Sequence, residues 1–273
     1  MIIRRGLDHL ARLAGLARPL LLDEPRCPGC GRVAQPVPGL DRSLCPDCCL
    51  ALAPPEAAAC PGCGQLSGLS SDLSSNSASD LAAGLPPDVP QQPAFCRACQ
   101  ESPRPWGRLV AFGAYDGRLR DLILRYKFEG QLGLGRQLQE CLALAFERSA
   151  AVLPELCACE LLVPVPLHPR RLSWRGFNQS RELARLVALR RGLPIRQEAL
   201  KRVRRTVPQM ELDRAHRAEN IRGAFAASPE ILAGRTALLV DDIMTTGSTL
   251  EECSRMMLAA GAAQVHVLVL ARA

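Results

Sequence analysis

Carboxylates, hydroxyls and a glycine gather in one short stretch near the C-terminal end of the chain. The apolar run TALLV (236–240) predicts a buried strand, and Asp241 and Asp242 follow it directly. Backbone N–H groups of a turn and of a helix N-terminus bind phosphate dianions, and two carboxylates can accept hydrogen bonds from ribose hydroxyls. The sequence therefore predicts a ribose 5-phosphate site, whose phosphate-binding turn consists of Thr245, Thr246, Gly247, Ser248 and Thr249.

Each part of this stretch also has a simpler interpretation. Two aspartates after a strand can begin an ordinary loop, and threonine or serine beside glycine can cap a helix. Taken whole, the string 238–250 resembles the signature with which type I phosphoribosyltransferases bind 5-phosphoribosyl 1-pyrophosphate (PRPP). The resemblance implies that Asp241 and Asp242 hold the ribose hydroxyls and that 245–249 binds the 5-phosphate. It also implies Mg²⁺, bound together with PRPP and largely by PRPP oxygens.

A basic loop follows the apolar run LLVPVP (161–166) and offers donors for a pyrophosphate group. It contains Arg170, Arg171 and Arg175, whose planar guanidinium groups can form paired hydrogen bonds with phosphate oxygens. A solvated basic loop is the alternative. Because open α/β sheets bind ligands at the carboxyl ends of their strands, we expect this loop to supply the other half of the site.

Cysteine is the most unusual component of the composition, with thirteen residues. Eight of them form four C-x-x-C pairs. In a reducing compartment such pairs bind metal rather than form disulfides, and two pairs complete a tetrahedral site. Unmetallated thiols and an iron site are the alternatives. The order of the pairs predicts two zinc sites, one made by Cys27, Cys30, Cys45 and Cys48 and the other by Cys60, Cys63, Cys96 and Cys99.

The two predicted zinc sites are built from a repeated segment. The string C-P-G-C-G occurs at 27–31 and again at 60–64, where the glycines allow the backbone to fold under the metal. The second site contains a Ser- and Pro-rich insertion (64–95) with few large apolar side chains. Because such a segment cannot bury enough surface to offset its ordering entropy, we expect a solvated loop there. A phosphorylated regulatory segment is the alternative.

These candidate sites require helices and strands that hold them in place. Apolar residues at three-to-four spacing predict helices around 119–126, 131–150, 179–191 and 248–260. Continuous apolar runs predict buried strands at 161–166, 236–240 and 265–271. Strands that are apolar throughout and alternate with helices indicate an α/β fold, with a parallel sheet flanked by helices on both faces.

The composition divides the chain into three parts. Residues 1–26 form a basic amphipathic pattern that predicts a helix, 27–105 predict a double zinc ribbon, and 106–273 predict the α/β domain. The chain contains no apolar run of the roughly 18–20 residues that span a bilayer. Charged residues also interrupt any signal-peptide core near the N-terminus. We therefore expect a cytoplasmic protein without a membrane span.

The motif RGFNQS (175–180), beside VDDIMTTGST (240–249) and the cysteine module, resembles the ComF/GntX family. The string YKF (126–128) is a further matching piece. The resemblance implies a double zinc ribbon followed by a type I phosphoribosyltransferase-like domain. It also implies a link to DNA uptake in natural transformation, with a helicase-like competence ATPase as a partner. Within the PRPP site, it implies additional binding residues, namely Lys127, Arg171 and Arg175.

Positive charge is concentrated in one part of the chain. Residues 161–222 contain 14 arginines and one lysine against five acids, a net charge of +10, whereas the whole chain carries +7. The basic arm (201–225) could close over the active site, as a mobile loop does in phosphoribosyltransferases, or follow a nucleic-acid backbone. An arginine-rich genome is the third explanation. For single-stranded nucleic acid, the candidate binding residues are Arg202, Arg204, Arg205 and Arg217.

Two functions of different class follow from these patterns. The first is a PRPP-binding phosphoribosyltransferase that transfers ribose 5-phosphate to an unknown acceptor and releases pyrophosphate. The second is a non-catalytic accessory protein of natural competence, which binds single-stranded nucleic acid and uses the PRPP site as a sensor or scaffold. The sequence contains no obvious base for an acceptor, so it does not decide between them.

Overall fold

The computed structural model describes residues 26–33, 44–52, 59–65, 94–168, 172–173, 176–204 and 219–273. The chain divides into two compact units, Met1–Leu50 and Ala51–Ala273. The predicted helix over 1–26 and most of the insertion 64–95 lie outside the described residues. The predicted domain boundaries at 27 and 106 stay predictions.

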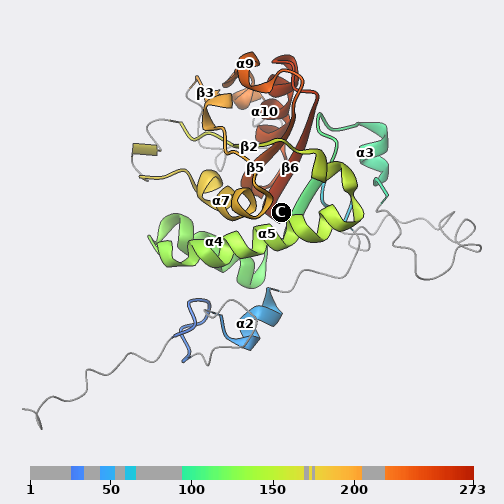
Figure 1. Ribbon diagram of the computed structural model, residues 1–273. Helices are drawn as coiled ribbons and strands as arrows, with labels where there is room; N and C mark the ends of the chain where they lie inside the picture. The colour runs from blue at the N-terminus through green and yellow to red at the C-terminus, as the bar shows by residue number, and fades with distance from the viewer. Residues whose placement is uncertain are drawn as a thin grey trace, which may run out of the picture. The chain divides into compact units, whose positions relative to one another are not determined.

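A parallel sheet of four strands forms the centre of the second unit (Figure 1). The strands lie in the order β1 (Leu109–Ala114), β6 (Gln264–Arg272), β5 (Thr236–Met244) and β2 (Leu161–Pro164). Each neighbouring pair is parallel. The predicted α/β fold with a parallel sheet is therefore confirmed. Strand β1 was not predicted, because the sequence pattern of 106–160 is mainly helical.

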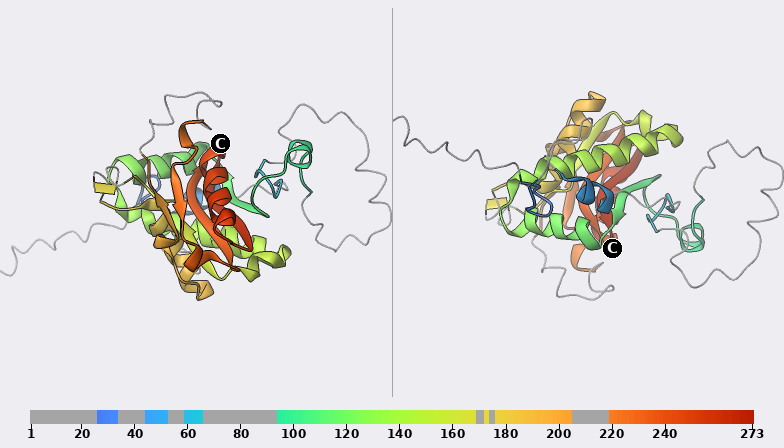
Figure 2. Two further views of the ribbon diagram at one scale, coloured as in Figure 1. Left: turned by 90° about the horizontal axis from the view of Figure 1, so that it is seen from above. Right: turned by 90° about the horizontal axis from the view of Figure 1, so that it is seen from below.

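Helices cover both faces of the sheet, as Figures 1 and 2 show. One face carries α4 (Gly117–Phe128), α5 (Gly135–Val152) and α7 (Gln179–Arg191). The other face carries α10 (Ser248–Ala259) together with a hairpin of β3 (Leu200–Arg202) and β4 (Phe225–Ala227). The remaining short elements are α2 (Pro46–Ala51), α3 (Arg97–Glu101), α9 (Pro229–Leu232), η1 (Leu132–Leu134), η2 (Pro154–Ala158) and η3 (Gln197–Ala199).

The apolar core explains why the sequences of these strands are continuous hydrophobic runs. Successive side chains of a strand point to opposite faces, and here both faces are covered. In β5, Ala237 and Leu239 pack in the cluster that includes Leu250 and Met257 of α10. The intervening residue, Leu238, is equally buried. An apolar residue is therefore required at every position of this part of the strand.

Local sequence signals fix the ends of α7, which begins next to the acidic pair. The Asn178 side chain accepts a hydrogen bond of 3.0 Å from the backbone N–H of Ser180, which makes Asn178 the N-cap. The helix ends at Gly192, whose φ of 65° lies in the left-handed region.

Among the described residues, no helix combines the length and apolar character needed to cross a bilayer.

Candidate functional site

The acidic pair lies inside a strand rather than after it. We expected the strand to end at Val240, yet β5 continues to Met244 because β6 pairs with it as far as Arg272. On its other side, β2 ends at Pro164, which pairs with Val240. The last residues of β5 thus extend past β2 at the carboxyl end of the sheet, where open α/β sheets bind their ligands.

Two side chains from other elements contact the acidic pair. Lys127 of α4 places its Nζ 2.7 Å from Oδ2 of Asp242. Ser180, in the first turn of α7, donates a hydrogen bond of 2.8 Å from Oγ to Oδ1 of Asp241. Side chains of Lys127 and Asp242 are only 14% and 10% exposed, so this ion pair is largely withdrawn from water.

The environment of Asp241 disfavours its charged form. Burial, together with the neighbouring charge of Asp242, raises the pKa of Asp241 to about 7, against the opposing effects of Lys127 and of the hydrogen bonds to its carboxylate. Two adjacent carboxylates in a poorly solvated site have a high affinity for protons, cations and hydroxyl donors. The hydroxyls of a ribose ring belong to that class of partner.

The predicted phosphate-binding turn forms at the N-terminus of α10. Gly247 adopts φ 86°, and a Cβ at this position would lie 2.7 Å from Cε of Met244, so only glycine fits without strain. The Oγ atoms of Thr246 and Ser248 lie 3.0 Å apart. Hydroxyls and helix N–H groups are thereby brought to one end of α10, where Thr246 Oγ1 accepts from the N–H of Ser248 at 3.4 Å, and an anion site uses donors of this kind.

Three separate sequence motifs meet at the acidic pair. The ring of Tyr126, next to Lys127, packs against Phe177 with centroids 5.5 Å apart. Asn178 donates from Nδ2 to the carbonyl of Val165, just after β2, at 3.1 Å. Sequence reasoning assigned no role to Tyr126, Asn178 or Ser180. The signals that pointed to them were the motif YKF (126–128) for Tyr126 and the motif RGFNQS (175–180) for Asn178 and Ser180.

The predicted arginine binding residues are less fully described. Arg202 lies with its guanidinium 5.4 Å from the ring centroid of Phe225. Arg204 donates from Nη2 to the carbonyls of Asn220 and Arg222, at 2.9 and 2.6 Å. Both therefore contact the protein itself, and their binding of nucleic acid stays a prediction. Four further candidates fall outside the described residues: Arg171, Arg175, Arg205 and Arg217.

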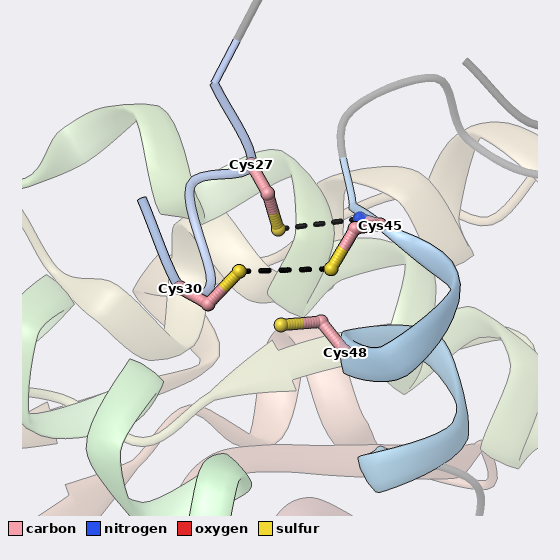
Figure 3. A group of neighbouring side chains, drawn as sticks. All are labelled: Cys27, Cys30, Cys45 and Cys48. Atoms are coloured by element: carbon pink, nitrogen blue, oxygen red, sulfur yellow. Dashed lines mark hydrogen bonds between the residues drawn. The ribbon is translucent and has the colours of Figure 1, made fainter. Parts of the chain in front are cut away.

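The first unit holds the first group of four cysteines, whose side chains point toward one another (Figure 3). The ligand atoms of Cys27, Cys30, Cys45 and Cys48 all lie within 4.8 Å of one another. Sulfurs of Cys30 and Cys45 are 3.6 Å apart. Zinc–sulfur bonds of about 2.3 Å in a tetrahedron place sulfurs about 3.8 Å apart, so this donor set fits zinc.

The second unit holds an equivalent group. Cys60, Cys63, Cys96 and Cys99 meet the same 4.8 Å limit, and the sulfurs of Cys63 and Cys96 are 3.7 Å apart. The two groups also share their surroundings. The N–H of Cys45 donates to Cys27 Sγ, and that of Cys96 donates to Cys60 Sγ, both at 3.2 Å. Gly31 and Gly64 take left-handed φ values of 75° and 70°. The two predicted four-cysteine groups are therefore present, each able to hold a zinc ion.

Three successive carbonyls attach the second cysteine group to the sheet. The carbonyl of Pro61 accepts from the N–H of Leu109 in β1, at 2.6 Å. That of Gly62 accepts from Nε1 of Trp106 at 2.8 Å, and that of Cys63 accepts from Nε of Arg272, in β6, at 2.9 Å. The second group is thus a structural part of the α/β unit.

A parallel sheet with this acidic pair and hydroxyl-rich turn defines a phosphoribosyltransferase-like domain. The family model described as "Phosphoribosyl transferase domain" matches residues 181–273. Competence protein F of Haemophilus influenzae is 36% identical over 180 residues, which cover 65% of this chain and 78% of that protein. The chain therefore belongs to the ComF family, as the sequence motifs predicted.

The chain is also similar to other proteins. DNA utilization protein YhgH of Escherichia coli K12 is 35% identical over 193 residues, covering 69% of this chain and 82% of that protein. Competence protein ComFC of Bacillus subtilis is 26% identical over 165 residues, covering 58% and 61%. Among solved structures, the glutamine PRPP amidotransferase of B. subtilis superimposes with a TM-score of 0.32 and 22% identity, covering 48% of this chain and 25% of that one.

Proposed function

We propose that the chain binds PRPP and transfers its ribose 5-phosphate to an acceptor, with release of pyrophosphate. The observation that carries this proposal is the meeting of the acidic pair, Lys127 and Ser180 beside the N-terminus of α10. In the proposed complex the turn 245–249 binds the 5-phosphate. Asp241 and Asp242 accept hydrogen bonds from the ribose hydroxyls, and Lys127 contributes positive charge to an anionic ligand.

The arrangement also suits the chemistry of the transfer. The bond between ribose C1 and the pyrophosphate oxygen breaks, its electron pair leaves with pyrophosphate, and the acceptor forms a new bond to C1. Positive charge builds on the ribose ring during this step, and the buried carboxylates of Asp241 and Asp242 are placed to stabilise it. In the proposed complex, Mg²⁺ would arrive with PRPP and neutralise the leaving pyrophosphate, and we assign it no protein ligand.

Replacing Gly247 with alanine tests this site. We expect the Gly247→Ala chain to bind PRPP and Mg²⁺ at least about tenfold more weakly in calorimetry, because φ 86° strains an alanine within the turn and the added Cβ also requires the buried Met244 side chain to move. Gly234→Ala is a matched control. Gly234 also has a positive φ, 72°, but an added Cβ there has open space around it, so this variant is expected to bind PRPP like the unaltered chain. Absence of PRPP binding by the unaltered chain contradicts the proposal.

A second candidate function is the binding of single-stranded DNA. Relatives of this chain are named for competence and for DNA utilization, and the segment 161–222 carries a net charge of +10. We propose that these basic residues bind the phosphates of single-stranded DNA in the cytoplasm, and that a helicase-like competence ATPase is a partner of the chain. The PRPP site would then act as a sensor or scaffold. Binding of this kind depends on ion pairs with phosphates and weakens as the salt concentration rises.

Salt dependence tests the DNA proposal. We expect the logarithm of the association constant for an oligothymidylate to fall linearly with the logarithm of salt concentration. The double variant Arg205→Ala/Arg217→Ala should bind more weakly, and its slope should be smaller by about 0.7 for each phosphate that is no longer neutralised, measured by fluorescence anisotropy. The exposed Arg235, outside the basic arm, provides the control variant Arg235→Ala. No binding by the unaltered chain at about 50 mM salt counts against this function.

A further inference from the structure

One buried aromatic ring is hydrogen-bonded to the second cysteine group and lies beside the proposed phosphate turn. Trp106 is 5% exposed. Its Nε1 donates to the carbonyl of Gly62, which lies between two ligands of the cysteine group. A Cβ placed on Gly247 would lie 3.7 Å from Cη2, at the far end of the same indole. The ring thus spans from the metal-binding segment to the turn that begins α10.

Arg104 ties the indole to α10 by a second route. Its guanidinium lies 5.9 Å from the centroid of the Trp106 ring and forms an ion pair with Glu251, in the first turn of α10. Side chains of Arg104 and Glu251 are only 22% and 20% exposed, so solvent screens this pair weakly. The first turn of α10 and the indole are therefore held against each other at two points.

We propose that Trp106 is a positioning residue through which the second cysteine group sets the shape of the turn 245–249. The proposal rests on the proposed function, since the turn matters as the binding site of a sugar phosphate. A phosphate is bound by N–H groups that already point at it, so small displacements of the turn reduce affinity. The Gly62 carbonyl can hold the indole only while the neighbouring Cys60 and Cys63 are held by their own partners. Metal occupancy of the second group thereby controls the phosphate affinity of the turn on the other side of the Trp106 indole.

The test uses the full chain with Trp106→Phe. Phenylalanine keeps a ring in the core but lacks both atoms of the link, the Nε1 donor and the distal Cη2. We expect faster hydrogen–deuterium exchange in the peptide covering 245–250 and unchanged exchange in β6 over 265–270. Affinity for ribose 5-phosphate should fall about fivefold in calorimetry, the effect of removing one hydrogen bond that orders the turn. Chelation of zinc from the unaltered chain should speed exchange over 245–250 in the same way, with little further change in the variant.

A core variant separates positioning from general destabilisation. Leu232, a fully buried side chain at the end of α9, gives the control Leu232→Val, which should leave exchange over 245–250 unchanged. Unchanged exchange over 245–250 in Trp106→Phe, while the unaltered chain binds ribose 5-phosphate, overturns this inference alone. Coupled exchange in a chain that does not bind ribose 5-phosphate overturns the proposed function and, with it, the positioning role.

Discussion

Chains carrying Cys99→Ser are expected to hold one zinc ion instead of two and to unfold at a temperature lower by at least about 10 °C. The decrease should be large because the second cysteine group supports the sheet directly. Its segment 61–63 offers three carbonyls to hydrogen-bond donors in or beside β1 and β6. Elemental analysis and differential scanning calorimetry of freshly purified, reduced protein measure the two effects.

The size of this effect follows from what structural zinc contributes. Apparent binding free energies of about 10–16 kcal/mol in small zinc-binding peptides are comparable with the whole stability of an ordinary domain, about 5–15 kcal/mol. In this chain we expect only part of the zinc-binding free energy to contribute to the stability of the sheet. In a unit of this size, each kcal/mol of lost stability lowers the unfolding temperature by about 2–4 °C. A loss of a few kcal/mol therefore lowers it by about 10 °C.

Two control variants make the zinc prediction specific. Cys157 is exposed and lies outside both groups, so Cys157→Ser should keep two zinc ions and the original unfolding temperature. Cys48→Ser should also lose one zinc ion. Because the first group belongs to a compact unit of its own, that loss should leave the main transition of the α/β unit nearly unchanged. Two zinc ions in Cys99→Ser, or none in the unaltered chain, would show that the metal assignment is wrong.

Sequence patterns were most informative where the residues of a candidate site are close together along the chain. The acidic pair and the hydroxyl turn occupy 241–249 as one strand–turn–helix segment, so their local arrangement follows from their order. The cysteine groups were predictable for a related reason. Each C-x-x-C pair is a local turn, and the repeat of C-P-G-C-G at 27–31 and 60–64 divides the four pairs into two successive groups. The structure confirms both four-cysteine groups.

Contacts between distant residues were beyond the reach of the sequence pattern. Ser180 and Asp241 are separated by 61 residues, and hydrophobic periodicity carries no information on which hydroxyl meets which carboxylate. Lys127 was named through the family resemblance, whereas its ion pair with Asp242 depends on how α4 packs beside the sheet. Strand β1 was not predicted because a six-residue edge strand with three small residues resembles a connection between helices, and only its pairing with β6 defines it.

The burial of Asp241 lowers the stability of the folded chain above the pKa of its carboxyl group. In Asp241 the folded state raises the pKa from 3.8 to about 7, so the folded chain holds a proton that the unfolded chain releases. Between about pH 4 and pH 7, the unfolding free energy therefore falls as pH rises, and above pH 7 the full cost of ionising Asp241 is present. Active sites are where such costs are expected, because the groups are arranged for binding rather than for stability.

Replacing Asp241 with asparagine should therefore stabilise the chain, although it weakens the proposed binding of PRPP. Asparagine is neutral at every pH, and its Oδ1 can still accept from Ser180 and from the backbone N–H that Asp241 now binds. Above pH 7 we expect a gain on the order of 4 kcal/mol, or roughly 10 °C in unfolding temperature. At pH 4 the gain should vanish, because Asp241 is then protonated in the folded chain.

The substitution Asp242→Asn should lower the stability of the folded chain, whereas Asp241→Asn should raise it. Asp242→Asn removes the counterion of Lys127, whose side chain is 14% exposed, and an ammonium left in that position costs on the order of 2 kcal/mol. Both variants should bind PRPP at least about tenfold more weakly, because each removes a carboxylate from the proposed ribose site. Asp121→Asn, in a half-exposed ion pair with Arg125, changes the net charge equally and should shift stability by no more than about 0.5 kcal/mol. If calorimetry across pH 4–8 gives both variants a stability change of the same sign, the burial of Asp241 does not govern its charge.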